Sequence, residues 1–435
     1  MKRIIIFSFI AVSALLFASC EQQEPLPTYP NGDLPIFNGY MQFSTEVSTR
    51  ANLATDMKGK AFGVIGFEYS NTAFWSGAKS TTTPDAFYNQ RVDCNADNGV
   101  CQYDYTNPNS SGNKPMPWGD YRYAFFAYHP FNGVGISLSD KTATNTPMLT
   151  YTYGWLNPTG NPGWLDTQYD VDGDTDFETV IDLTHAEVPV FDLMTAEAVD
   201  VTGQTGQGRV ALDFKHRMCA IEVLANNYNE NIYEYDTDAD GNFILDEDGN
   251  KTYKLDANGN KIIAQGGNAR QEISNLTLTI EGLAHTSMTI PLSTKEDDPA
   301  FDPVYTPGSV GTRYFIVSHK KVIIPAFNEV TADGRGEGVA TSLSQLGSTT
   351  GGYFMFIPQA GSTTGIKGTL RWDQLDSFKE NAEDKDKVNN EFKSTIDFVP
   401  GKLYQVYINF VGDGITIALI EAGNWDIRNV KHTFE

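Results

Sequence analysis

The chain has 435 residues and a formal net charge of −24, so it is long enough for two hydrophobic cores and is strongly acidic. The acidic excess argues against nucleic acid as a partner and against charge-driven binding to an anionic membrane surface. Aromatic residues are abundant, with 21 Tyr and 26 Phe. Short alternating runs between turn residues predict an all-β fold, with two β-domains that are sandwiches or barrels.

Residues 1–19 have the pattern of a secretion signal peptide that ends before Cys20. Lys2 and Arg3 form its basic start, Ile4–Phe17 is apolar, and two small residues precede the cysteine. This arrangement resembles a lipobox and predicts a lipoprotein acylated at Cys20 and held in the outer membrane. Glu21–Glu24, directly after the cysteine, resembles a surface-export signal and predicts exposure at the cell surface. An ordinary signal peptide followed by a chance cysteine is the alternative. Residues 20–38 contain four prolines and predict an extended, lipidated tether.

Residues 39–205 are predicted to form the N-terminal β-sandwich domain. Its first strand is Tyr40–Val47, and Tyr123–Pro130 is an aromatic strand that should cross the core. Cys94 and Cys101 bracket a short loop. In the oxidising environment of an exported protein, this spacing predicts a disulfide rather than a metal site.

Residues 206–435 are predicted to form the C-terminal β-sandwich domain, which begins with the strand pattern of Val210–Ala225. Its apolar residues alternate first at even positions and then at odd positions. A strand that exchanges its inward face in this way needs a bulge or a change of partner sheet. We place that change near His216–Met218.

A hairpin insertion is predicted near residues 232–264. Three similar five-residue turns recur there, at Asp238–Asn242, Asp246–Asn250 and Asp256–Asn260. Their Asp-Gly and Asn-Gly pairs are typical of type I′ hairpins. Asp236, Asp238, Asp240 and Glu247 also occupy positions 1, 3, 5 and 12 of a calcium-loop pattern. The strand-like flanks favour plain turns, and calcium is the one cofactor that we keep as a candidate.

A second acidic stretch, Asp170–Glu178, places carboxylates at alternate positions. Such oxygens suit a hard cation, although Gly173 does not fit the calcium-loop pattern. A solvated acidic loop is the alternative interpretation.

The later part of the domain contains further alternating runs. Apolar residues alternate in Leu276–Ile280 and again in Met288–Leu292. These two runs are predicted to pair with each other across Gly282. The last two predicted strands are Leu403–Val411 and Ile415–Ala422. These runs favour a sheet-rich domain that continues to the end of the chain.

Motifs of catalysis are absent from the sequence. It has no His-Glu-x-x-His, no Gly-x-Ser-x-Gly, no phosphate-binding glycine loop and no Cys-x-x-Cys. His129 stands before a proline at a strand end and is interpreted as structural, and Cys219 is interpreted as a buried apolar residue. We predict that the protein is not an enzyme.

Taken in order, several short signatures resemble the fimbrillin family of Bacteroidota, the type V pilins and their lipoprotein relatives. They are Cys20, Thr49-Arg50-Ala51, Phe62–Phe67, Tyr123–Pro130, Asp192–Ala196, Leu212-x-Phe214-x-His216, Ile357-Pro358-Gln359 and Pro400-Gly401-Lys402. The resemblance covers nearly the whole chain after the signal peptide.

The resemblance implies two tandem β-sandwich domains of the transthyretin-like or Greek-key kind. It also implies a structural or accessory fimbrial subunit, of the stalk, tip or anchor, that supports adhesion. In such pilins an Arg-specific protease removes the first strand, and a terminal strand of the next subunit fills the groove. In this chain the cut would fall between Arg50 and Ala51, and Tyr40–Val47 would be the strand removed. Ile415–Ala422 with the tail would be the donor. The implied partners are other fimbrial subunits.

The alternative is a surface lipoprotein that does not polymerise and binds a glycan or a host protein. Trp75, Trp155 and Trp164 are candidate platforms for sugar rings, although core or loop packing is the simpler interpretation of these residues. Binding of glycans by the monomer would favour this alternative.

Overall fold

The computed structural model describes residues 42–47, 57–97, 101–103, 118–141, 146–156, 163, 165, 167–171, 176–185, 188, 192–203, 209–308, 312–329, 340–344, 354–359, 365–374, 386–411 and 414–424. Within these ranges nearly all regular structure is strand, so the all-β prediction is confirmed. The described part contains one short α-helix, α1 (Trp75–Ala78), and a 3-10 turn, η2 (Gly154–Leu156). Neither is long enough to cross a bilayer, and the described residues include no other helix that is.

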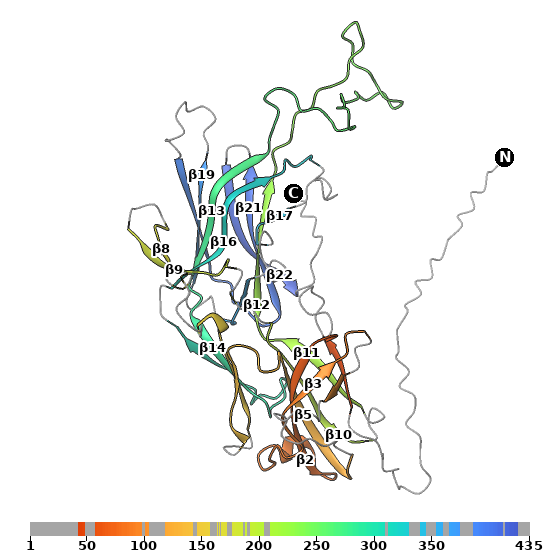
Figure 1. Cartoon of the computed structure of the whole chain (residues 1–435), viewed down its shortest axis with the longest axis vertical. Helices are drawn as coiled ribbons and strands as arrows, with labels where there is room; N and C mark the ends of the chain where they lie inside the picture. The colour runs from red at the N-terminus through yellow and green to blue at the C-terminus, as the bar shows by residue number, and fades with distance from the viewer. Residues whose placement is uncertain are drawn as a thin grey trace, which may run out of the picture.

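A closed barrel forms one end of the molecule (Figure 1). In order around the barrel, its strands are β1 (Gln42–Val47), β11 (Arg209–His216), β10 (Met194–Val201), β5 (Tyr121–His129), β2 (Ala61–Ser70), β3 (Phe87–Cys94) and β4 (Cys101–Tyr103). The ring closes because β1 pairs with both β11 and β4.

Strands β2 and β5 are apolar on both faces because both faces are covered. Tyr123 and Phe125 belong to the cluster inside the barrel. Ala124 and Phe126, which alternate with them, belong to a second and larger cluster. This double coverage explains the continuous apolar run that the sequence shows at this strand.

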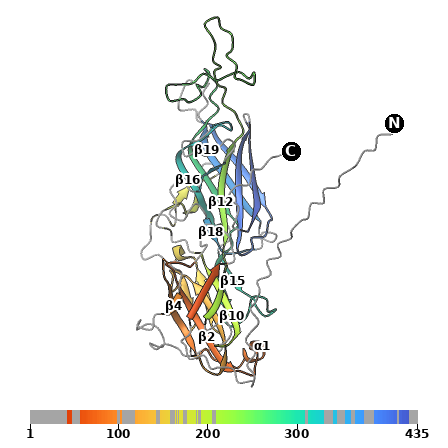
Figure 2. The same cartoon turned by 90° about the vertical axis from the view of Figure 1, so that its right-hand side faces the viewer.

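Two facing sheets form the part of the molecule beyond the barrel (Figures 1 and 2). One sheet contains β12 (Cys219–Asn227), β17 (Thr341–Ser342), β18 (Phe354–Phe356), β21 (Lys402–Val411) and β22 (Gly414–Asn424). The other has the order β20 (Asp386–Ser394), β19 (Ile366–Gln374), β13 (Gln271–Glu281), β16 (Arg313–Ile324), β9 (Glu178–Asp182) and β8 (Thr167–Tyr169). Their inward side chains share one hydrophobic cluster.

The predicted division at residues 205 and 206 does not separate the sheets. Strand β11 follows that position and yet lies in the barrel, whereas β8 and β9 precede it and join β16. A four-stranded sheet mixes both halves of the chain in the order β15 (Val304–Pro307), β14 (His285–Pro291), β7 (Met148–Thr152) and β6 (Ile136–Leu138). The two halves of the chain share sheets because each strand pairs with strands that are distant in the sequence. The alternation within one strand does not encode which strand it will pair with.

The change of inward face predicted near His216–Met218 is confirmed. Strand β11 ends at His216 in the barrel, and β12 begins at Cys219 in the neighbouring sheet. The chain therefore changes sheets within two residues, and each strand keeps its own inward face. Cys219 is buried, as predicted, and its thiol donates a hydrogen bond to the Val399 carbonyl.

The runs on either side of Gly282 do not pair with each other. Strand β13 pairs with β16 and β19, whereas β14 pairs with β7 and β15. Gly282 has φ of +94°, and a Cβ there would lie 2.2 Å from the Gly365 carbonyl oxygen. The glycine therefore allows a sharp exit from one sheet into another, which the alternation alone does not distinguish from a hairpin turn.

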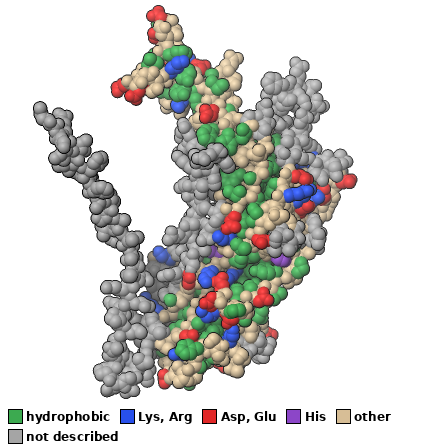
Figure 3. Space-filling view, turned by 180° about the vertical axis from the view of Figure 1, so that it is seen from behind, with side chains coloured by type: hydrophobic (Ala, Val, Ile, Leu, Met, Phe, Trp, Pro, Cys, Tyr) green, Lys and Arg blue, Asp and Glu red, His purple; other side chains and the backbone are tan. Residues whose placement is uncertain are grey.

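Residues 232–264 form an exposed arm at the end of the molecule opposite the barrel (Figures 1 and 2). Paired bridges connect its short strands, and Gly241, Gly249 and Gly259 have positive φ in the three turns. The predicted hairpins are present, but their turns are not of type I′. That type needs positive φ at two successive residues, whereas the residue before each of these glycines does not have it. The Gly241 N–H donates to the Asp238 carbonyl, so the glycine follows the two central residues of its turn. Acidic side chains gather at the tips of the arm (Figure 3).

Candidate functional site at the first strand of the barrel

Strand β1 is attached to the barrel mainly along one edge. Six consecutive residues, from Gln42 to Val47, pair in parallel with Arg209–Phe214 of β11. On its other side, the one pair that β1 makes with β4 among the described residues is Phe43–Cys101. Parallel ladders are slightly weaker per residue than antiparallel ones, and β1 has one long ladder instead of two.

The barrel interior next to β1 is apolar. Val210, Leu212 and Phe214 alternate along β11, are buried and belong to the interior cluster. The ring of Phe214 packs edge-on against Phe62, with centroids 5.2 Å apart. Without β1, this row would border an open sheet edge with unpaired backbone groups.

The Cys94–Cys101 disulfide lies on the other side of β1. The two cysteines are bonded and pair across β3 and β4, and Cys101 is also the residue that faces Phe43. The predicted disulfide is therefore present, and it fixes the short hairpin that forms the second wall beside β1.

Removing this disulfide should destabilise the protein by about 2–3 kcal/mol, because it closes a loop with a sequence separation of 7. We expect the double variant Cys94→Ser, Cys101→Ser to unfold at a lower urea concentration than the wild type. A reductant should lower the midpoint of the wild type and leave that of the variant unchanged. Identical midpoints for the oxidised wild type and the variant would contradict a stabilising role.

Two histidines flank the neighbouring strand at the end of the barrel. Met194 of β10 pairs with His129 on one side and with His216 on the other. Nδ1 of His216 lies 2.7 Å from Oδ1 of Asp192, and Nδ1–H of His129 donates to the Ala61 carbonyl at 2.7 Å. His129 therefore has a structural position, in agreement with its interpretation from the sequence.

Burial lowers the pKa of His129, although the hydrogen bond to Ala61 and the charge of Asp192 oppose this shift. The unfolded chain has an ordinary histidine pKa near 6.5, so below about pH 6.5 it takes up a proton that the folded protein resists. Folding stability should fall as the pH drops through this window, by at most about 1.4 kcal/mol per pH unit for this one group. Urea unfolding at two pH values on either side of the window measures this slope.

The variant His129→Gln should show a shallower pH dependence between those values, because it removes the titrating ring. Carboxylates titrate at lower pH and contribute little to the slope in this window. An unchanged slope in the variant would assign the effect to another group.

An ion-paired arginine occupies the junction where the chain leaves the barrel. Arg217 is buried, its Nε donates to Thr195 Oγ1 at 2.6 Å, and its Nη1 lies 3.0 Å from Glu296 Oε1. Its guanidinium also lies over the Phe301 ring at 5.2 Å. Sequence reasoning missed this cluster, because its members are far apart in the chain and form no motif.

The predicted processing and lipidation residues, Cys20, Arg50 and Ala51, lie outside the described residues. The candidate calcium residues Asp236, Asp238, Asp240 and Glu247 are described, but no three acidic, His or Cys side chains converge to hold a metal in the part of the chain that the structure describes.

Asp238 instead stabilises its turn. Its Oδ1 accepts the backbone N–H groups of Asn242 at 2.9 Å and of Asp240 at 3.0 Å. The hydrogen bonds from Asn242 and Asp240 lower the pKa of Asp238. Asp246 and Asp256 make the corresponding contacts in the other two turns. Asp238, Asp246 and Asp256 therefore cap the turns of the arm, and calcium binding there stays a prediction.

Trp75 is not a sugar platform. Its side chain is buried against Phe67, Tyr69 and Phe126, and its Nε1 donates to the Ser293 carbonyl at 3.0 Å. Trp75 thus connects α1 to the segment after β14. The side chain of Trp155 and the whole of Trp164 lie outside the described residues.

No family model matches the chain. The fimbrium subunit Fim1C of Phocaeicola vulgatus is 27% identical over 222 residues, which is 49% of this chain and 48% of that protein. The resemblance to fimbrial proteins of Bacteroidota is confirmed. The chain spans about half the length of this curated relative, whose name is that of a fimbrial component and not of an enzyme.

Solved structures with fimbrial names are also similar to this fold. A fimbrial protein of Bacteroides vulgatus is 16% identical, with a TM-score of 0.47, over 88% of this chain and 99% of that one. A fimbrial assembly protein of Parabacteroides distasonis is 9% identical, with a TM-score of 0.30, over 89% of this chain and 97% of that one.

Proposed function

We propose that this chain is a subunit of a cell-surface fimbria that supports adhesion and assembles by strand exchange at β1. The fimbrial name of the curated relative supports the assembly with other subunits. The observation that carries the exchange step is that, within the described ranges, β1 closes the barrel through one parallel ladder of six residues and one pair with β4. A strand attached in this way can leave without breaking the antiparallel ladders of the other barrel strands.

Departure of β1 would create an acceptor for a new strand. The backbone edge of β11 would lose its partners along Gln42–Val47, and the buried row Val210, Leu212 and Phe214 would lie beside the gap. An incoming strand restores the hydrogen bonds of that edge and covers the apolar row, which is the physical basis of strand addition. Apolar side chains contribute about 1.5–3 kcal/mol each when they are fully buried.

The donor is proposed to come from the end of the chain. Strand β22 includes Ile415–Ala422 and is paired with β21 at ten positions, at the edge of its sheet. Release of β22 would break its hydrogen bonds with β21. Residues 425–435 follow β22 directly, so they are the part of the donor that can pair with another subunit while β22 stays in its sheet. Those residues lie outside the described ranges.

Processing and anchoring complete the proposal. Cleavage between Arg50 and Ala51 would separate β1 from the rest of the chain, because the cut follows Val47 by a few residues. Acylation at Cys20 would hold the precursor at the outer membrane until that cut. An uncut chain would keep both β1 and its lipid, as suits an anchor subunit or the alternative, a binding lipoprotein that does not polymerise.

The test is to treat unlipidated Glu21–Glu435 with an Arg-specific protease and to follow it on unboiled gels and by electron microscopy. Cleavage after Arg50, followed by a ladder or filaments, is expected for a polymerising subunit. Cleavage without a ladder would indicate a tip or capping role, or a missing partner. Resistance at Arg50, with a persistent monomer, would overturn strand exchange and favour an anchor or a binding lipoprotein.

A further inference from the structure

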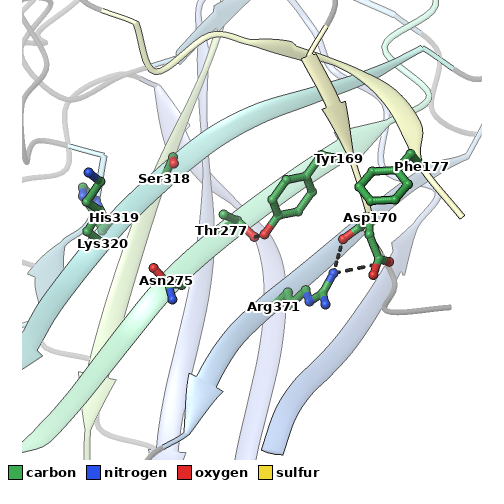
Figure 4. A pocket seen from close by; sticks show the side chains of 9 residues that line it. All are labelled: Tyr169, Asp170, Phe177, Asn275, Thr277, Ser318, His319, Lys320 and Arg371. Carbon is green, nitrogen blue, oxygen red and sulfur yellow. Dashed lines mark hydrogen bonds and ion pairs between the residues drawn. The ribbon is translucent and has the colours of Figure 1, made fainter. Parts of the chain in front are cut away.

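A cavity of about 480 Å³ lies on the outer face of the sheet that contains β13, β16 and β19 (Figure 4). This volume is within the roughly 300–1,000 Å³ that is typical of small-molecule sites. The hairpin of β8 and β9 belongs to the same sheet and supplies Tyr169, Asp170 and Phe177. None of these strands pairs with β1, so the cavity is separate from the proposed assembly site.

Arg371 forms the base of the cavity, and it is 6% exposed. Its Nη1 donates to the backbone carbonyl of Asp170 and lies 3.4 Å from that residue's carboxylate (Figure 4). Its guanidinium carries five N–H donors and no acceptor, and it lines the cavity, so it can donate to the oxygen atoms of a ligand there.

Polar groups at the rim face the same space. Asn275 lines the cavity with φ of +49°, where the pairing of β13 with β19 shifts register between Ser274 and Thr277. Bulges of this kind re-aim side chains and are common beside binding sites. Ser318 and Lys320 on β16 add a hydroxyl and an ammonium group, and both residues are exposed.

An exposed aromatic ring lies at the opposite end of the cavity. Phe177 is 67% exposed, and Figure 4 shows its ring next to Tyr169. The Tyr169 ring is itself held by Phe315, at 4.9 Å between centroids, and by the Arg371 guanidinium at 5.9 Å. Tyr169 is therefore a fixed wall, and Phe177 presents an apolar surface that no packing within the described chain explains.

This combination selects a chemical class of ligand. A pyranose ring has an apolar face of C–H bonds and an edge of hydroxyl oxygens. The face suits Phe177, and the edge suits the donors of Arg371 and Asn275. Because Asp170 neutralises much of the charge of Arg371, the cavity does not require a charged ligand. We propose that this cavity binds a pyranose residue of a glycan. The binding goes beyond the proposed assembly role, which does not need it.

The test uses the unlipidated monomer, so its outcome does not depend on assembly. Ligand-observed NMR would screen methyl glycosides of glucose, galactose, mannose, fucose and N-acetylglucosamine, together with glucuronic acid and N-acetylneuraminic acid, at about 10 mM, which detects millimolar affinities. We expect at least one sugar to bind. Phe177→Ala should weaken that binding by about tenfold or more, and Ser318→Trp should block it by filling the cavity.

The matched control is Phe74→Ala, because Phe74 is a similarly exposed ring, at 60%, that does not line the cavity. Its sugar affinity should equal that of the wild type. Absence of binding for every sugar in the panel would overturn the proposal, as would equal affinities for the wild type and Phe177→Ala. Binding confined to the two acidic sugars, lost in Lys320→Ala and kept in Phe177→Ala, would show a carboxylate site and also overturn it.

Discussion

Replacing Phe214 with alanine is expected to lower the free energy of unfolding by about 3–5 kcal/mol, the cost of a large cavity in a packed core. Phe214 is fully buried in the barrel and packs against Phe62. It also pairs with Val47 at the end of the β1 ladder, so its loss weakens the interior at the place where β1 is attached. Urea unfolding followed by tryptophan fluorescence measures the change.

The control for this variant is Phe177→Ala, which removes the same side chain from an exposed position. Surface substitutions away from packed features change stability by about 0.5 kcal/mol or less, so the two variants should differ clearly. A Phe214→Ala protein as stable as the control would mean that the barrel interior is not packed as the structure shows. Limited proteolysis of the Phe214→Ala protein should also release the segment that contains β1 more readily than in the wild type.

Replacing Arg50 with alanine is expected to abolish ladder formation after treatment with an Arg-specific protease. The reason is that the uncut chain keeps β1 in place, and an intact barrel has no free β11 edge for a donor. Densitometry of unboiled gels measures the effect, and the expected reduction is about a hundredfold or more.

The rescue for this variant is an engineered site for a sequence-specific protease, inserted between Val47 and Ala51 of Arg50→Ala. Cleavage there should restore the ladder, because it frees β1 in the same way. A ladder from Arg50→Ala without this cut would show that assembly does not depend on release of β1. Failure of the rescue would show that separation of β1 is not sufficient.

Several features of the structure could be predicted from the sequence, because they depend on residues that are close together in the chain. The period of two in Val210–Ala225 predicted strands, and its change of parity predicted the change of sheet near His216–Met218. The Asp-Gly and Asn-Gly pairs of the arm predicted its turns, and the close spacing of Cys94 and Cys101 predicted their disulfide. Each of these depends on neighbours in the chain, which is why composition and spacing suffice.

The candidate sites depended on pairings that no local pattern contains. The alternation of Leu276–Ile280 is the same whether β13 pairs with β14 or, as in the structure, with β16 and β19. The calcium pattern shows a related limit, since it does not reveal that Asp238 accepts backbone N–H groups of its own turn.

The sequence by itself determined the all-β class, the strands at its alternating runs, the hairpins of the arm, the acidic composition and the absence of catalytic motifs. Only the tertiary structure decided that β1 lies against β11, that the two halves of the chain share sheets, and that Arg371 meets Asp170 beneath Phe177. The physical reason is that the apolar side chains on one face of a strand can be buried against any sheet of matching shape. The choice among partners is made by packing and closure across the whole chain.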